Sequence, residues 1–276
     1  MPRIYLPISR ILDNRISITN EKAHYLTSVL RCGKGDELII FDGKGDCFRT
    51  TILKADRREI ITEVIEKFQC NAESNINIAL VQGLLKGEKM DMVIQKTTEL
   101  GVKEIIPVIT ERSQLRDTRK VARWRKIAEE ASRQSGRSIV PVINEPVEFK
   151  NLFTVHCSQF TVHGFIFYEE EGMKLSEAVE ILKDTLPSKY GTAPDLQKIT
   201  PHSPLILRGD KEGLESGLSP NILIAIGPEG GFTKEEIALA KDRGLIVATL
   251  GKRILRSETA AISAVTLMQF LLGDIG

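Results

Sequence analysis

Two glycine-rich turns near the C-terminus hold the residue types best suited to chemistry. The first, GPEGGF, covers residues 227–232 and follows a short apolar run. The second lies within LGKRILRSETAA, residues 250–261, where two arginines and a glutamate stand among small residues. Glycines let backbone N–H and C=O groups approach a ligand closely, and an arginine can stabilise developing negative charge. The turns therefore predict a ligand site with charged groups at its edge.

Each turn needs a strand before it and a helix after it. The apolar run Ile222–Ile226 predicts a buried parallel strand. Thr233 and Glu236 then form a capping-box pattern, and the helix that they start should end at Gly244. A second strand is expected over residues 245–250, and a second helix over residues 258–272. Two such units side by side place a crevice at the carboxyl ends of parallel strands.

The glycine spacing limits the choice of ligand. It is not the GxxxxGK[ST] pattern of a phosphate-binding loop. It is also not GxGxxG, and no acidic residue follows at the distance that a ribose contact in a dinucleotide fold requires. A nucleotide-binding oxidoreductase that uses the same crevice is therefore an alternative, but a disfavoured one.

The two turns together resemble the signature of the SPOUT methyltransferases, in the form found in the ribosomal RNA small-subunit methyltransferase E family. Residues 87–102, GEKMDMVIQKTTELGV, and the ERS triplet at Glu111 resemble the same family. The resemblance implies methylation of N3 of a uridine in small-subunit (16S) ribosomal RNA, with S-adenosylmethionine as cofactor. It implies an α/β fold with two domains. A small PUA-like β-barrel forms the N-terminal domain, and the methyltransferase domain that follows has a parallel sheet and a C-terminal trefoil knot. It also implies a homodimer paired through the knot region, and no metal.

Roles for individual residues follow from this resemblance. Uridine N3 is a poor nucleophile while protonated, so a cation near O2 or O4 would stabilise the uracil anion. Arg256 is the candidate for that cation, and Glu258 would orient Arg256 or accept the proton. Glu169 or Glu170, at the end of an earlier strand, could meet the ribose or amino group of the cofactor; a plain surface turn is the alternative. The expected cofactor-binding residues are Gly227, Pro228, Glu229, Gly230, Leu250, Gly251, Arg253, Ile254, Leu255, Thr259 and Ala260.

Residues 1–72 are expected to form the small β-rich domain. Short strand-like runs alternate with turn signals such as Asp42-Gly43-Lys44-Gly45, a pattern typical of a small barrel. The first 34 residues hold six Lys or Arg against two acids. Such an excess is often only a solvated face, but the PUA-like resemblance favours RNA contacts by Arg3, Arg10 and Arg31.

The methyltransferase domain is expected over residues 73–276, and it contains a dense basic segment. The stretch from Arg112 to Arg137 contains nine Lys or Arg residues but only three acidic residues. Val121, Trp124 and Ala128 mark the buried side of a helix there, so many of its cations must point outward. This pattern favours an RNA-binding surface that includes Arg119, Arg123 and Lys126. Residues 186–220, rich in proline, glycine and serine, are expected to be a flexible insertion where typical relatives are shorter, either a lid, a species-specific contact or a segment with no role.

The composition fits a cytoplasmic protein whose RNA affinity comes from local patches. The net charge of the 276-residue chain is only +1, and the four cysteines contain no CxxC pair. Neither a zinc site nor a disulfide framework follows, and no segment has the length of a membrane span. A third class, a non-catalytic RNA-binding assembly factor, remains open, although the intact RSETA run argues against it.

Overall fold

The computed structural model describes residues 1–7, 14–70, 72–155, 163–185 and 221–276. The chain divides into two compact units. The first contains Met1–Glu73 together with Glu129–Val140, and the second contains Ser74–Ala128 and Pro141–Gly276. The predicted insertion at 186–220 and Arg10 lie outside the described residues.

The first unit is built on a curled five-stranded sheet in the order β1-β3-β4-β5-β2. The strands are β1 (Arg3–Tyr5), β2 (Arg15–Thr19), β3 (Glu37–Phe41), β4 (Asp46–Ala55) and β5 (Glu59–Gln69). Helix α1 (Asn20–His24) continues into a π-helical turn, η1 (Tyr25–Val29). Alternate strand residues such as Ile18, Leu38, Ile40 and Ile60 are completely buried, so the period-two pattern supplies the core. The predicted turn at residues 42–45 joins β3 to β4.

Glu73 fastens the segment 129–140 to this unit. Its carboxylate accepts hydrogen bonds from the backbone N–H groups of Ser138 and Ile139, at 2.9 and 2.8 Å. It also forms an ion pair with the buried Arg137, at 3.0 Å. A buried arginine needs such a partner, so this carboxylate explains how the segment is held although it is distant in sequence.

The second unit is a parallel sheet in the order β11-β13-β10-β12-β6-β7-β8, with β9 paired to β7. Its strands are β6 (Asn77–Gly83), β7 (Glu104–Ile109), β8 (Val142–Ile143), β9 (Val147–Glu148), β10 (His163–Phe167), β11 (Met173–Lys174), β12 (Asn221–Ile226) and β13 (Ile246–Thr249). Its helices are α2 (Lys89–Glu99), α3 (Val121–Ser135, which runs on into the first unit), α4 (Phe149–Val155), α5 (Leu175–Thr185), α6 (Lys234–Asp242) and α7 (Ser257–Leu272). The predicted parallel α/β architecture is confirmed.

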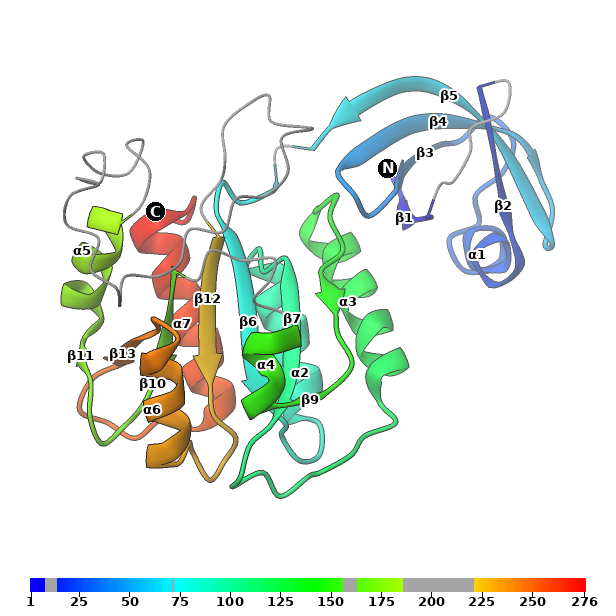
Figure 1. Ribbon diagram of the computed structural model, residues 1–276. Coiled ribbons are helices and arrows are strands. Elements are labelled where there is room, and N and C mark those ends of the chain that lie inside the picture. Colours follow the sequence, from blue (N-terminus) through cyan, green and yellow to red (C-terminus); the bar gives the residue numbers. More distant parts are fainter. Residues whose placement is uncertain (8–13, 71, 156–162, 186–220) are drawn as a thin grey trace. The chain divides into compact units, whose positions relative to one another are not determined.

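Helices cover both faces of this sheet (Figure 1). On one face α4 and α6 pack together, and Phe149, Leu152 and Ile237 join the strand residues Leu223 and Ala225 in one apolar cluster. On the other face α7 packs against α2, β6 and β12. Strand β12 is therefore buried on both sides, which explains its uninterrupted apolar sequence.

The local predictions around the two turns are also confirmed. Thr233 caps α6, and the reciprocal bond from its own N–H to Glu236 completes the capping box. Gly244 follows α6 in a left-handed conformation, with φ of 88°. Beyond β13 the chain returns across the sheet to begin α7 beside β12 and β6. The trefoil knot itself stays a prediction.

Candidate active site

A cavity of 550 Å³ opens at the carboxyl ends of three neighbouring strands. Phe167, Ile226 and Thr249 are the last residues of β10, β12 and β13, and all three line it. The turn after β12 and the loop between β13 and α7 supply most of the remaining wall. Sequence reasoning placed a crevice here, and the sheet order explains it, because β10 lies between the two strands that carry the turns.

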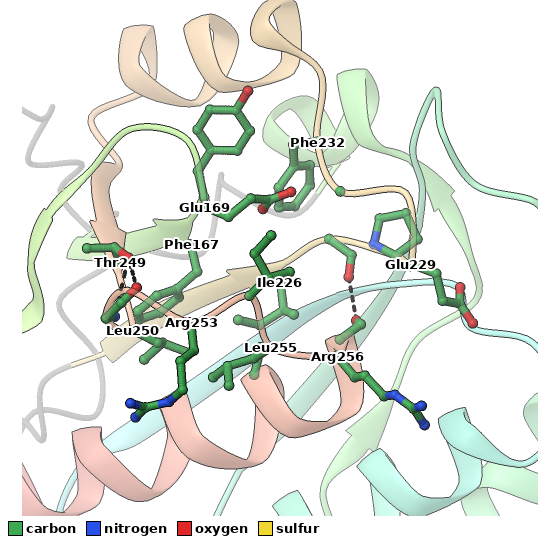
Figure 2. Close-up of a pocket in the computed structure, with 18 of the residues that line it drawn as sticks. Phe167, Glu169, Ile226, Glu229, Phe232, Thr249, Leu250, Arg253, Leu255 and Arg256 are labelled. Carbon is green, nitrogen blue, oxygen red and sulfur yellow. Dashed lines mark hydrogen bonds between the residues drawn. The ribbon is translucent and has the colours of Figure 1, made fainter.

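The cavity combines an apolar interior with exposed polar backbone. Figure 2 shows Phe167, Ile226, Phe232 and Leu255 around it, together with Leu250. Two turns bring backbone groups to the same wall. Pockets of this volume that offer both apolar side chains and polar groups suit a small organic ligand. An adenine ring needs such an apolar slot, and its polar edge and the ribose can be met by backbone groups.

The turn after β12 is fixed from two directions by hydrogen bonds. Ser257, the first residue of α7, donates from its hydroxyl to the carbonyl of Gly227. Gln82, near the end of β6, donates from Nε2 to the Ser257 hydroxyl at 3.0 Å. All three groups are buried. These two hydrogen bonds tie the turn, which forms one wall of the cavity, to both β6 and α7.

Close backbone packing explains why glycine is needed at two of these positions. A Cβ atom at Gly83 would lie 2.8 Å from the Gly227 carbonyl carbon and closer still to Pro228 N. A Cβ atom at Gly227 would lie 3.1 Å from the Gly231 carbonyl carbon. The end of β6 and the turn after β12 therefore touch through their backbones.

The second loop is held by its own threonine. The Thr249 hydroxyl donates to the Gly251 carbonyl at 3.1 Å and accepts from the Gly251 N–H at 3.3 Å (Figure 2). Gly251 has a φ of 111°, a conformation that side chains disfavour. Leu250 is therefore presented to the cavity by a tight turn.

Charged groups surround the cavity. Glu229 forms an ion pair with Lys89 at 3.0 Å, and its carboxylate also accepts from the Lys86 N–H. Burial raises the pKa of Glu229, but these hydrogen bonds outweigh burial and leave that pKa below its ordinary value. Glu229 is therefore ionised at neutral pH and ties the turn to α2.

Two arginines border the other side. In Figure 2 the guanidinium groups of Arg253 and Arg256 extend outward from the loop before α7, away from Ile226 and Phe232. Both residues line the cavity and are exposed. The Glu169 carboxylate stands near the turn, where Oε1 would lie 2.9 Å from a Cβ atom at Gly231. The Glu169 carboxylate could therefore bind an amino group of a ligand, and Arg253 or Arg256 could bind a negatively charged or electron-rich edge.

Most of the predicted cofactor-binding residues lie together in this cavity. Its lining includes Gly227, Pro228, Glu229, Leu250, Gly251, Arg253, Ile254, Leu255 and Ala260. Gly230 and Thr259 are not part of the lining. Gly230 instead packs against Arg112, whose guanidinium donates to the Gly230 carbonyl at 3.2 Å. Thr259 is exposed on the first turn of α7. Their cofactor contacts remain predictions.

Of the predicted catalytic pair, only Arg256 lines the cavity. Glu258 is half-buried, and its Oε2 has no hydrogen-bond partner within the described part of the chain. A catalytic role for Glu258 remains a prediction.

Sequence reasoning missed several lining residues. Phe167, Phe232, Thr249 and Ser257 line the cavity, and so does Lys89. Phe232 and Ser257 stand inside the two motifs, so the motifs themselves carried the signal. Phe167 and Thr249 could have been found as the final residues of strands that end at the crevice.

The predicted RNA-binding residues have different surroundings. Arg119 and Lys126 are exposed, and Arg123 forms an ion pair with Asp91 at 2.7 Å. Arg31 is exposed with a left-handed φ of 56°. Arg3 is half-buried within the first unit, where its Nη2 donates to the Arg137 carbonyl at 3.1 Å. RNA contacts by these residues remain predictions, and for Arg3 the structure shows internal bonds that compete with that role.

Two further properties concern the whole described chain. Among the described residues, no helix combines the length and apolar character needed to cross a bilayer. Within the same residues, no three His, Cys, Asp or Glu side chains gather in a metal-binding arrangement.

The sequence of this chain matches two known protein families. A family described as an RNA methyltransferase domain matches residues 72–192 and 202–269. A second family, an RNA methyltransferase PUA domain, matches residues 18–65. The break between residues 192 and 202 falls within the segment predicted to be an insertion. The two families account for the parallel-sheet unit and the curled sheet, respectively.

Individual relatives match over nearly their full length. The ribosomal RNA small subunit methyltransferase E of Buchnera aphidicola is 32% identical, over 99% of this chain and 95% of the relative. The Bacillus subtilis protein of the same name is 31% identical, over 92% of this chain and 89% of its own. The crystal structure of the Neisseria gonorrhoeae protein of that name, bound to S-adenosyl methionine, superposes with a TM-score of 0.79 at 30% identity, covering 100% of both chains. The chain therefore belongs to the ribosomal RNA small subunit methyltransferase E family.

Proposed function

We propose that this protein methylates N3 of a uridine in small-subunit ribosomal RNA in the cytoplasm, with S-adenosylmethionine as methyl donor. The observation that carries the proposal is the cavity at the ends of β10, β12 and β13, which has an apolar interior, two backbone-lined turns and Arg256 at its border. The relatives named for ribosomal RNA methylation support the substrate class, and the Neisseria gonorrhoeae structure supports the cofactor.

The residues present fit the cofactor. The cavity is large enough for it, and the close packing of Gly83 against the Gly227–Pro228 turn holds the backbone of that turn at the cavity wall. Leu250 and Leu255 would hold the adenine ring, and Glu169 would meet an amino or hydroxyl group. When bound, the cofactor supplies an electrophilic methyl group.

The residues of this chain must position the uridine base and favour its deprotonation. N3 lies on the pairing edge of the base, so the nucleotide must be unpaired or flipped out before it can enter the cavity. N3 must also lose its proton before it can attack. Arg256 borders the cavity and is reached from solvent, so a base that enters would meet its guanidinium. Hydrogen bonds from Arg256 to O2 or O4 would stabilise the uracil anion as it forms.

A direct test uses tritiated S-adenosylmethionine and two substrates, naked small-subunit RNA and assembled small subunits from cells that lack the gene. We expect the label to enter one uridine, as a product that blocks reverse transcription at that position. Heat-inactivated protein is the control. Binding of the cofactor without label transfer to either substrate would favour a non-catalytic RNA-binding protein, and binding of NAD instead would favour an oxidoreductase.

We further propose that exposed cations of α3 and of the residues just before it bind the RNA backbone. Replacing Arg119, Arg123 and Lys126 by alanine should lower RNA affinity and reduce its salt slope by roughly 0.7 to 0.9 for each phosphate that is no longer neutralised. Cofactor affinity should remain near that of the wild type, since none of the three lines the cavity. Filter binding at several salt concentrations measures the slope.

A charge-matched control separates a specific surface from general attraction. Lys150, Lys174 and Lys241 are exposed elsewhere in the same unit, and their replacement removes the same charge. An equal loss of affinity in both triple variants would refute a specific RNA-binding surface formed by α3 and the residues just before it. Because Arg123 pairs with Asp91, thermal unfolding of each variant must accompany the binding data.

We also infer that the protein forms a two-fold dimer through α7. One face of this helix, including Ala264, Val265 and Met268, is buried against its own chain. On the same helix Leu267 and Phe270 are 38% and 61% exposed. Exposed apolar side chains on a helix whose other face is already buried favour packing against a second protein surface, here a second copy of the chain.

Light scattering should therefore give twice the chain mass of 30.8 kDa at micromolar concentration. Phe270→Glu should give a monomer, because it places a charge within the proposed interface. Ile181→Glu on α5, at a residue 45% exposed, is the matched control and should leave the dimer intact. A monomeric wild-type mass would contradict the proposal.

A further inference from the structure

Two cysteines distant in sequence meet inside the first unit, away from the cavity. Cys47 lies on β4 and is completely buried, and Cys70 directly follows β5 and is half-buried. Cys47 is paired with Phe68 across the antiparallel ladder. Cys70, two residues further on, therefore projects on the same side as Phe68. The two sulfur atoms lie 2.7 Å apart, so only a small side-chain movement would allow a covalent bond.

An arginine stands beside both thiols. Nη1 and Nη2 of Arg3 each lie 3.6 Å from the Cys70 sulfur, and Nη2 lies 4.0 Å from that of Cys47. The guanidinium is held in place by the Arg137 carbonyl and stacks over the Phe41 ring, 5.4 Å from its centroid. A fixed cation next to a sulfur stabilises the negative charge that the sulfur carries when it attacks an electrophile.

The two thiols differ in their surroundings. Burial, followed by the hydrogen bond with Cys70, raises the pKa of Cys47 to about 12. Cys47 therefore stays protonated at neutral pH and can donate its S–H to the neighbouring sulfur. Cys70 is the partner that solvent reaches, and the arginine stands closest to it. An oxidant would meet Cys70 first.

We propose that Cys47 and Cys70 form a redox-active dithiol, which a hydroperoxide converts to an intramolecular disulfide. The Cys70 thiolate attacks one peroxide oxygen and the O–O bond breaks, so that Cys70 becomes a sulfenic acid and the peroxide leaves as water or an alcohol. The Cys47 sulfur then attacks the Cys70 sulfur. As it attacks, its S–H proton passes to the hydroxyl group of the sulfenic acid, which leaves as water. Two electrons pass from the thiols to the peroxide, and a dithiol reductant reverses the change.

The bond would join β4 to the chain that leaves β5. Glu73, three residues beyond Cys70, holds the segment 129–140 through Arg137 and two backbone amides. A covalent link here reduces the freedom of the unfolded chain. Oxidised protein should consequently unfold at a higher temperature than reduced protein.

The test is to treat the reduced full-length protein with hydrogen peroxide, block the remaining thiols and measure the mass before and after digestion. We expect a loss of two hydrogen atoms and one peptide pair linked through Cys47 and Cys70, which dithiothreitol separates. Cys32→Ser, in the apolar core of the same unit, and Cys157→Ser, outside the described residues, should both retain the link. Cys47→Ser should lose the link and accumulate a sulfenic acid at Cys70 that dimedone traps.

Arg3→Gln tests the role of the cation. Loss of the neighbouring charge should slow formation of the link by about tenfold, the effect of removing one hydrogen bond to a charged group. An unchanged rate would show that the arginine has no part in the reaction. Absence of the linked peptide in the wild type, or a link made through Cys32 or Cys157 instead, would overturn the proposal.

Discussion

Replacing Arg256 by alanine is expected to lower the rate of methyl transfer by about two to three orders of magnitude while S-adenosylmethionine binding stays near the wild-type level. The loss corresponds to about 3 to 4 kcal/mol, the typical effect of removing one well-placed electrostatic donor. Arg256 borders the cavity from the N-terminus of α7 and is exposed. It can therefore reach an incoming base without filling the space of the cofactor. Calorimetry gives the binding constant and single-turnover transfer gives the rate.

Two companion measurements sharpen this result. Arg256→Lys should recover little activity, because an ammonium group cannot reproduce a planar fork of donors. The rate of the alanine variant should rise partly at alkaline pH, since hydroxide can then remove the N3 proton that Arg256 no longer helps to release. A parallel fall in rate and in cofactor affinity would show that Arg256 binds the cofactor rather than the base.

Replacing Gly83 by alanine is expected to weaken S-adenosylmethionine binding, whereas Arg256→Ala should lower the rate and leave that binding intact. The added methyl group would lie 2.8 Å from the Gly227 carbonyl carbon and closer still to Pro228 N. Backbone atoms cannot rotate away, so the turn after β12 must move. Overpacking of this kind costs about 1 to 3 kcal/mol. If that cost falls on the bound form, affinity drops by roughly tenfold to a hundredfold. Calorimetry with S-adenosylmethionine measures it.

Gly227→Val should act in the same direction, because its side chain would enter the space beside Gly231 and Phe232. Gly33→Ala is the matched control. A Cβ atom there meets nothing within 4 Å, and its φ is not in the left-handed region. Wild-type cofactor affinity in Gly83→Ala would mean that the turn after β12 does not form the cofactor wall.

The sequence determined the elements whose signals are local. The capping box of Thr233 and Glu236, the left-handed stop at Gly244 and the strand before GPEGG all occur as predicted. Each depends on backbone hydrogen bonds or φ values set by a few adjacent residues, so a short stretch of sequence is sufficient to specify it. The same motifs also indicated the family, and through it the cofactor.

Only the tertiary structure decided which distant residues meet. Phe167 and Thr249 share a cavity because β10 and β13 are neighbours in the sheet, an order that no periodicity encodes. Ser257 reaches Gly227 because the chain crosses back over the sheet before α7.

Arg3 shows the same limit in the first unit. Its charge suggested an RNA contact, yet its guanidinium lies beside Cys47 and Cys70 and donates to the Arg137 carbonyl. Charge is a property of the residue, but the partner of that charge is set by long-range packing. The sequence therefore specified the local elements and their motifs, and the packing of the sheets selected which of their side chains act together.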